Sequence, residues 1–180
     1  STPIKSSAAS DVYKRQPSVY VGTYGKYNEG SLCGLWIDLS SFSDYDEFID
    51  FCKAIHADEP DPELMAQDYE AFPRQWYNEG FMSEEDFDHI QEYTELCDKY
   101  DVDAVDDYME FADELDNFEE AYCGEWDSEE DFARHIVEEC YDLERTMGDL
   151  SRYFDYEAFG RDLFMWDYNM GANNHVFRRI

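Results

Sequence analysis

The sequence predicts an α+β protein with a small α+β unit towards each end of the chain and a helical stretch between them. Three observations lead to this fold class. An alternating apolar stretch near residue 20 indicates a β-hairpin, and a motif of serine and carboxylates precedes a helical apolar stripe three times. Aromatic residues are also abundant, with 15 Tyr, 13 Phe and 4 Trp in 180 residues. Because such rings bury large areas in defined packing, we expect a folded chain.

Residues 1–16 differ from the rest of the chain. They are small, polar and mildly basic, and they show no apolar periodicity. We interpret them as a non-native or disordered leader and leave them out of the fold prediction.

The segment Ser18–Leu39 predicts a β-hairpin. Apolar and small residues alternate over its first half, as on a strand with one buried face. A loop containing Gly and Asn follows at Gly25–Ser31, and a second strand is expected at Leu32–Leu39. The residues expected to face inward are Val19, Val21 and Thr23 on the first strand and Leu35, Ile37 and Leu39 on the second.

Three predicted helices begin with the same motif. Ser43, Ser83 and Ser128 each precede a cluster of carboxylates with Asp at the third position. A serine N-cap accepts a hydrogen bond from a free backbone N–H, and carboxylates in the first turn complement the helix dipole. Apolar stripes at spacings of three and four follow. The stripes are Phe48, Cys52 and Ile55; Phe87, Ile90, Thr94 and Cys97; and Phe132, Ile136, Cys140 and Leu143.

The remaining elements give the order of the chain. The first and third motifs follow strand-like stretches, Leu32–Leu39 and Phe118–Trp126, and a last strand is expected at His175–Arg178. Between the end units, the stretch Gln75–Asp116 is helical, and its last helix should carry Val102, Val105, Met109 and Ala112 inward. We therefore place an N-terminal α+β domain at 17–74, a central acidic helical domain at 75–116 and a C-terminal α+β domain at 117–180.

Acidity is the strongest functional signal. The chain carries 45 Asp+Glu against 13 Lys+Arg, a net charge of −32, and residues 58–131 hold 29 acids and two bases. Like charges one helical turn apart cost a few tenths of a kcal/mol per pair, and solubility requires a net charge of only about 2–8. Duplex DNA carries about one charge per 1.7 Å, so this charge equals that of roughly 16 base pairs. The pattern indicates a basic partner that otherwise binds DNA.

The exposed faces of the middle helices are the candidate surface for that partner. Carboxylates one turn apart lie about 5–6 Å from each other, which is of the order of the spacing between phosphates. The candidate phosphate mimics are Glu84, Glu85, Asp88, Glu92, Asp103, Asp106, Asp107, Glu110, Asp113 and Glu114.

Other classes of protein fit less well. A salt-adapted surface is also acidic, but it is usually spread evenly along the chain. Asp98, Asp101 and Asp103 resemble the start of a calcium loop that lacks the required Gly. The four His show no metal-ligand spacing. We therefore expect no enzyme activity, no cofactor and no bound metal. The five scattered Cys indicate reduced thiols in a cytosol, and no apolar run spans a membrane.

Two long motifs resemble the ArdA family of antirestriction proteins. The first is PSVYVGTYGKYNEGS at 17–31, followed by LCGLWIDL at 32–39. The second is LERTMGDLSRYFDYEAFGRDL at 143–163, which looks like the antirestriction motif of that family. The stretch HVFRR at 175–179 resembles the family's usual ending. The resemblance covers residues 17–180.

The resemblance implies a function and an architecture. ArdA proteins are encoded on mobile elements such as conjugative plasmids and transposons, and they inhibit type I restriction–modification enzymes. Their fold is an elongated, curved chain of three small domains that dimerises through the C-terminal one, with a surface that mimics bent B-form DNA. The expected partners are thus the methyltransferase core of such an enzyme and a second copy, in a bacterial cytoplasm, with no direct binding to nucleic acid or membrane. The alternative is an acidic binding module for another basic DNA-binding protein or nuclease.

Two further groups of residues are candidates on this basis. We interpret the antirestriction motif first as domain packing and dimer support, and the strand Phe118–Trp126 as the dimer edge. The motif residues are Leu143, Glu144, Arg145, Asp149, Leu150, Arg152, Tyr153, Phe154, Asp155, Tyr156 and Phe159. The dimer residues are Phe118, Ala121 and Tyr122.

Overall fold

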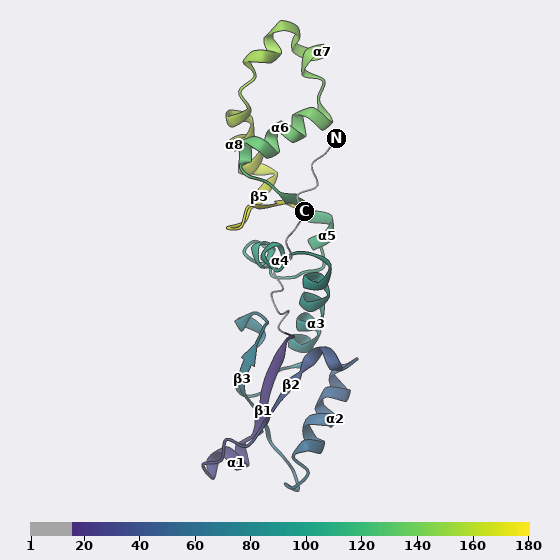
Figure 1. The fold of residues 1–180 in the computed structure, drawn as a ribbon, viewed down its shortest axis with the longest axis vertical. Helices are drawn as coiled ribbons and strands as arrows, with labels where there is room; N and C mark the ends of the chain where they lie inside the picture. Colours follow the sequence, from purple (N-terminus) through teal and green to yellow (C-terminus); the bar gives the residue numbers. More distant parts are fainter. Residues whose placement is uncertain (1–15) are drawn as a thin grey trace, which may run out of the picture. The chain divides into compact units, whose positions relative to one another are not determined.

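The structure, a computed structural model, describes residues 16–180, which fall into two compact units (Figure 1). Unit 1 runs to Thr94 and unit 2 starts at Glu95, so the boundary lies inside helix α3 (Glu84–Lys99) and within the predicted central domain 75–116. Apart from Gln16, the expected leader lies outside the described residues. Across these residues, eight α-helices and two three-stranded antiparallel sheets confirm the α+β class.

The sheet of unit 1 contains the predicted hairpin. Strand β1 (Ser18–Thr23) lies between β2 (Leu35–Asp38) and β3 (Leu64–Glu70), and both pairings are antiparallel. The inward residues of the first strand are all buried, as are Ile37 and Leu39. The second strand begins at Leu35 instead of Leu32. Leu35 pairs with the buried Val21 and so lies on the inner face of the sheet, as predicted, but at the start of the strand it stays 47% exposed.

The connection between β1 and β2 is more ordered than expected. It contains helix α1 (Tyr24–Asn28), which begins where the Thr23 hydroxyl accepts a hydrogen bond from the Lys26 N–H over 3.3 Å. The third strand, β3, was not predicted at all, because its sequence LMAQDYE does not alternate cleanly. It pairs along the whole of β1 and so completes the sheet.

The helix starts follow the predicted capping chemistry at two positions of three. The Ser83 hydroxyl accepts from the Asp86 N–H, and Ser128 accepts from Asp131, each over 3.1 Å. Helix α2 (Tyr45–Ile55) instead has Asp44 as its N-cap, which accepts from the Glu47 N–H over 2.8 Å. Its Ser43 lies one residue earlier and donates to the Glu47 carboxylate.

Aromatic rings fill the core of unit 1. Phe48 of α2 stacks on Phe87 of α3 with ring centroids 5.6 Å apart, and Phe81 stacks on the same Phe48 ring at 5.7 Å. The stripe residues Phe48, Cys52, Phe87 and Ile90 are all buried, as the periodicity predicts. Two short 3-10 helices, η1 (Leu39–Ser41) and η2 (Arg74–Trp76), join the helices to the sheet.

Unit 2 combines helices with three short strands. Its sheet has the order β4-β6-β5, with both pairings antiparallel. The predicted strand at Phe118–Trp126 divides into a helical turn and a strand, whereas the strand predicted at His175–Arg178 is confirmed. The elements after α3 are α4 (Val102–Met109), α5 (Phe118–Ala121), β4 (Tyr122–Glu125), α6 (Glu129–Cys140), α7 (Leu143–Met147), the 3-10 helix η3 (Gly148–Tyr153), α8 (Tyr156–Trp166), β5 (Tyr168–Met170) and β6 (His175–Arg178).

A second aromatic cluster forms the core of unit 2. The ring of Phe118 packs edge-on against Tyr108 at 5.4 Å and lies 5.9 Å from Phe177. Along α6, Phe132 and Val137 are buried. The predicted stripe residue Cys140 is exposed, because the helix ends there. The sequence therefore identified the inward face at the start of α6 but not at its end.

Candidate partner-binding surface

In unit 1, the candidate carboxylates lie on the outer face of helix α3. Its inner face is formed by Phe87, Ile90 and Tyr93, which are buried. Glu84, Glu85 and Asp88 are exposed, and Glu92 is half-buried. The N-terminal end of the helix favours this charge, because the first-turn carboxylates lie at the positive end of the helix dipole.

In unit 2, the candidate carboxylates lie on α4 and on the turn after it. Helix α4 begins at the N-cap Asp101, whose side chain accepts from the Asp103 N–H over 3.2 Å. The exposed carboxylates of this group are Asp103, Asp106, Glu110, Asp113 and Glu114. Nine of the ten predicted phosphate mimics are therefore at least partly open to solvent, four on unit 1 and five on unit 2.

Asp107 is the exception, and its predicted exposure was wrong. The buried face of α4 is formed by Ala104, Val105 and Tyr108, while Val102 is 43% exposed. This face is rotated by about one residue from the predicted stripe, and one residue corresponds to roughly 100° around a helix. The rotation turns Asp107 inward, where its side chain is 1% exposed. We therefore leave Asp107 out of the candidate surface.

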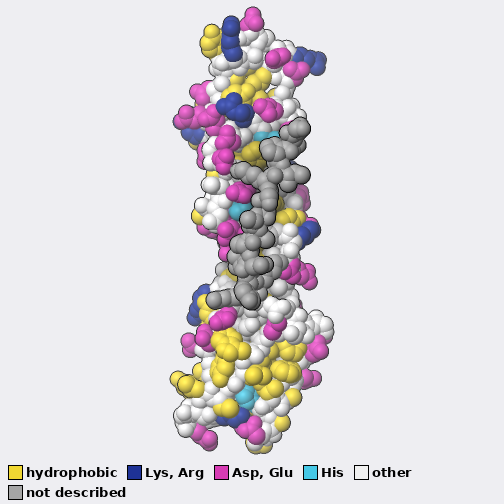
Figure 2. All heavy atoms as spheres, in the orientation of Figure 1, with side chains coloured by type: hydrophobic (Ala, Val, Ile, Leu, Met, Phe, Trp, Pro, Cys, Tyr) yellow, Lys and Arg dark blue, Asp and Glu magenta, His cyan; other side chains and the backbone are white. Residues whose placement is uncertain are grey.

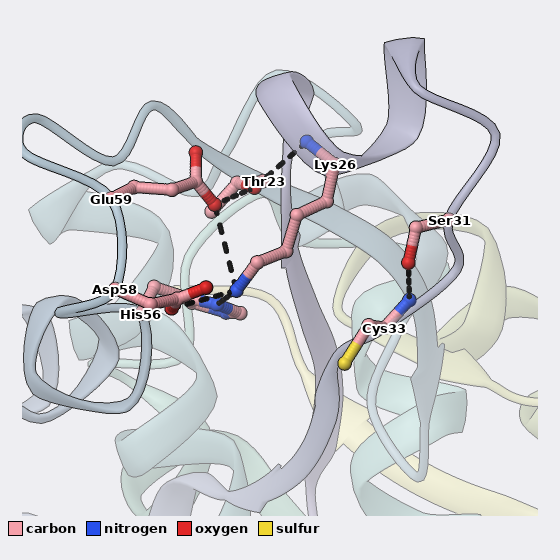
Figure 3. Close-up of polar contacts among 7 residues, drawn as sticks. All are labelled: Thr23, Lys26, Ser31, Cys33, His56, Asp58 and Glu59. Carbon is pink, nitrogen blue, oxygen red and sulfur yellow. Dashed lines mark hydrogen bonds and ion pairs between the residues drawn. The ribbon is translucent and has the colours of Figure 1, made fainter.

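Several of the cations in the described residues are bound to groups of the chain itself. Lys26 donates to Asp58 over 2.9 Å, lies 3.5 Å from Glu59 and is 3.1 Å from the ring of the buried His56 (Figure 3). The hydrogen bond with Asp58 raises the pKa of Lys26 and, in the same contact, lowers the pKa of Asp58. Thr23 also donates to Glu59 over 2.6 Å. This cluster ties α1 to the segment after α2.

Unit 2 uses its cations in a similar way. Lys99 is ion-paired with Glu119, and this hydrogen bond raises the pKa of Lys99. Arg134 pairs with Glu130 at 2.6 Å. At the end of the chain, Arg179 donates to the carbonyl oxygens of Phe164 and Met165. Cations engaged in this way screen the remaining carboxylates little, so these units present a strongly negative surface to a partner.

The predicted antirestriction motif forms a largely exposed segment of α7, η3 and α8. Leu150 is 61% and Tyr153 72% exposed, whereas Phe154 is half-buried and packs on Phe159 at 5.5 Å. The Arg134 guanidinium lies over the Tyr156 ring at 4.1 Å and so links α6 to α8. Of the other motif residues, Leu143 is half-buried, and the exposed ones are Glu144, Arg145, Asp149, Arg152 and Asp155.

The predicted dimer residues do not form an exposed strand. Phe118 and Ala121 belong to helix α5, and they are 0% and 1% exposed within unit 2. Their side chains are therefore core residues, and the expectation that they form a contact surface is corrected. Tyr122 is half-buried on β4, which is an edge strand of its sheet. The predicted dimer contact can therefore involve the backbone edge of β4, because an edge strand has unpaired N–H and C=O groups.

Two further findings concern metal binding and membrane insertion. Within residues 16–180, His, Cys, Asp and Glu side chains do not come together in groups of three that could hold a metal ion. Every helix in the same range is too short or too polar to cross a bilayer.

Sequence reasoning missed the cluster around Lys26. Its members come from two separate stretches of the chain, 23–26 and 56–59, and hydrogen-bond partners lie 30 to 36 residues apart. The capping residue Thr23 is a local signal for α1, but no periodicity points to the ion pairs.

Fold and surface together define a small, strongly acidic α+β protein whose surplus carboxylates lie on helical faces. The family model described as Antirestriction protein (ArdA) matches residues 19–177. The chain therefore belongs to the ArdA antirestriction family, and membership implies an antirestriction function directed against restriction–modification enzymes. A search of curated proteins finds no match.

Proposed function

We propose that this protein inhibits type I restriction–modification enzymes by occupying the DNA-binding groove of their methyltransferase core in place of B-form DNA. It catalyses nothing, binds no nucleic acid itself and needs no cofactor. The carboxylates of α3 and α4 stand in for phosphates and bind the Lys and Arg side chains that line the groove. The observation that carries this proposal is the set of nine solvent-facing carboxylates on these two helical segments.

The physical basis is an exchange of counterions. Both a DNA-binding groove and this protein hold counterions in solution, and their association releases them. A net charge of −32 gives the protein the charge of a length of duplex, so it competes with DNA for the same cations. Each exposed pair contributes only about 0–1 kcal/mol, so binding depends on many carboxylates together.

The architecture of the family is part of the proposal. We include in it an elongated, three-domain arrangement that mimics the shape of DNA, and a homodimer formed through the C-terminal part of the chain. The edge strand β4 and the exposed motif residues Leu150 and Tyr153 are the surfaces of unit 2 that support a contact between copies. Expression from a mobile element in a bacterial cytoplasm belongs to the same proposal.

Cleavage of an unmodified plasmid by a purified type I enzyme tests this function. Addition of the protein should block cleavage at a ratio of inhibitor to enzyme near one to one, and a mobility-shift assay should detect no binding of the protein to the plasmid. Undiminished cleavage in the presence of excess folded protein would contradict the proposal for that enzyme. Binding of the protein to the plasmid would contradict the decoy mechanism.

A further inference from the structure

The outer face of the unit 1 sheet carries an aromatic groove of about 510 Å³. Tyr20 and Trp36 lie directly opposite each other on β1 and β2, and their ring centroids are 5.5 Å apart. They alternate with Val19 and Val21, whose side chains face the core, so the two rings lie on the opposite face of the sheet. Tyr27 of α1 extends the aromatic wall. Figure 2 shows hydrophobic side chains gathered over this sheet.

A β-bulge brings a polar donor to the floor of the groove. Tyr20 pairs with Asp68 and Val21 with Ala66, so Gln67 is the extra residue on β3. Its side chain lies across Gly22, where a Cβ atom would be only 2.7 Å from Gln67 Nε2. Gln67 Nε2 is buried, and it has no hydrogen-bond partner among the described residues. A buried donor without an acceptor costs free energy, so rotation of the Gln67 side chain, which lines the groove, toward the carbonyl oxygen of a ligand would be favoured.

The charged residues that line the groove are acidic. Asp68 and Glu79 line it and are exposed, and none of the described residues that line it is Lys or Arg. Aromatic ring faces attract cations, and a planar guanidinium can stack on a ring while it pairs with a carboxylate. The groove therefore offers groups that can bind an arginine residue within a peptide: rings and carboxylates for the guanidinium, and an amide donor for a backbone carbonyl oxygen.

We propose that this groove binds an arginine side chain of the protein partner, with the guanidinium against Tyr20 and Trp36 and paired with Asp68 or Glu79. A carbonyl oxygen next to that arginine accepts the hydrogen bond from Gln67. The inference rests on the proposed function in one respect, because the partner is taken to be the DNA-binding enzyme. It adds to that function a contact outside the acidic helices α3 and α4. Salt weakens the aromatic part of this contact less than it weakens exposed ion pairs.

A second copy of the chain fits the groove less well. A two-fold contact places the same patch of both copies together. Asp68 and Glu79 of each copy would then face those of the other, and the described residues that line the groove include no cation to compensate for their repulsion. A cationic partner has the complementary charge.

The test is a titration of the isotope-labelled full chain followed by NMR. The probe is N-acetyl-arginine amide, and N-acetyl-citrulline amide is the matched control, because it has the same shape but no charge. The signals to follow are the indole N–H of Trp36 and the side-chain amide of Gln67. We expect saturable shifts of both signals with the arginine compound, and affinity for the citrulline compound weaker by about fivefold or more.

Variants make the test specific for the groove. Asp68→Asn together with Glu79→Gln should weaken arginine binding by about fivefold. Asn at position 68 can still accept the hydrogen bond from the Tyr69 N–H. The control pair Asp50→Asn and Glu63→Gln removes the same charge from other exposed positions of unit 1, and it should leave the titration unchanged. An unaltered spectrum away from the substitutions shows that each variant is folded.

Three results would overturn the inference. The first is equal binding of the arginine and citrulline compounds at the groove. The second is a set of arginine-dependent shifts confined to α3 and α4. The third is a shift of the Trp36 and Gln67 signals with protein concentration when no probe is present. The last result would assign the groove to a second copy. The titration contains no restriction enzyme, so a negative titration does not contradict the proposed function. A negative cleavage assay, in turn, does not change how the titration is interpreted.

Discussion

The carboxylate of Asp107 on α4 lies 3.0 Å from the Nδ1 atom of His175 on β6, and both side chains are buried. The same carboxylate accepts hydrogen bonds from the Asn173 backbone N–H at 3.0 Å and from the Asn173 side chain at 2.9 Å. It therefore fastens the turn before β6 to α4. Within the most acidic part of the chain, this carboxylate stabilises the fold and is not available to a partner.

Replacement of Asp107 should destabilise unit 2. Asp107→Ala removes the acceptor for Asn173 and leaves the buried His175 side chain without its partner, so we expect the free energy of unfolding to fall by about 2–4 kcal/mol. Urea denaturation followed by circular dichroism measures the change. Asp113→Ala, at an exposed carboxylate of the same segment, is the control and should change it by less than about 0.5 kcal/mol. Equal stability of the two variants would contradict the role of Asp107.

Gly171 should be required for the approach of this turn to α4. A Cβ atom at position 171 would lie 2.2 Å from the Asp107 Cγ atom, and the buried aspartate has little room to move. We expect Gly171→Ala to cost about 1–3 kcal/mol of stability. The Asp107 Cβ atom would also lie 2.3 Å away, so the matching background is Asp107→Gly, which removes both atoms; there the cost should be clearly smaller, and a double-mutant cycle gives the difference. An equal cost in both backgrounds would show that the clash is not the cause.

Inhibition should depend on many carboxylates together. Single changes such as Glu85→Gln or Glu110→Gln should alter the inhibitory concentration by about twofold or less, because exposed contacts contribute little each. Reversal of Asp103, Glu110, Asp113 and Glu114 to Lys should abolish inhibition. The matched control reverses Glu138, Glu139, Glu157 and Asp162, which are exposed elsewhere on unit 2.

The control should inhibit far better than the test variant, although the two have the same net charge. Loss of inhibition from one neutral substitution, with folding intact, would be evidence against a distributed surface. Equal loss in both four-fold variants would mean that net charge alone matters.

The cysteines should differ sharply in reactivity. Burial raises the pKa of the Cys52 thiol to about 12, whereas Cys33 and Cys140 are exposed. Iodoacetamide at pH 8 should therefore label Cys33 and Cys140 in the native protein, and Cys52 only after unfolding. Mass spectrometry of peptides gives the order of labelling. Early labelling of Cys52 in the folded protein would contradict its burial.

The same pKa shift predicts how the free energy of unfolding changes with pH. The pKa of Cys52 is raised in the folded state from an ordinary value of 9.0 to about 12. The folded protein therefore holds this proton more tightly than the unfolded chain does. The stability that it contributes is complete below pH 9 and falls as the pH rises towards 12. Cys52→Ala should flatten that fall in urea denaturation curves.

Substitution of Phe118 should unfold unit 2 instead of separating two copies. Its ring is fully buried against Tyr108, Tyr122 and Phe177. We expect Phe118→Ala to reduce stability by about 3–5 kcal/mol. Sedimentation of the unaltered protein tests the proposed homodimer, which requires twice the chain mass of 21.3 kDa. If the Phe118→Ala protein were folded, equally stable and monomeric in sedimentation, Phe118 would be a dimer-interface residue, as first predicted.

Local signals predicted much of this fold. The alternation around Val19 and the Ser83 and Ser128 caps depend on neighbouring residues, so the sequence alone predicts β1, α3 and α6. Strand β3 was missed because its position depends on pairing with β1, more than 40 residues earlier. The stretch at Phe118–Ala121 was taken for a strand because a short apolar run does not distinguish a strand from a helical turn.

The candidate site was predictable to a similar extent. Exposed carboxylates follow from the helical period, which places Glu84, Asp88 and Glu110 outward. Asp107 was misplaced because α4 is short, and a stripe of four residues can be shifted by one position without losing its period. The Gln67 bulge and the ion pairs of Lys26 join distant segments, and no local pattern encodes them.

Displacement of fluorescent target DNA from a type I methyltransferase core across a salt series tests DNA mimicry most directly. We expect stoichiometric displacement at low salt that weakens as salt rises, because binding of the protein to the enzyme releases counterions. Failure of the folded protein to displace DNA at low salt would contradict mimicry of DNA at that enzyme.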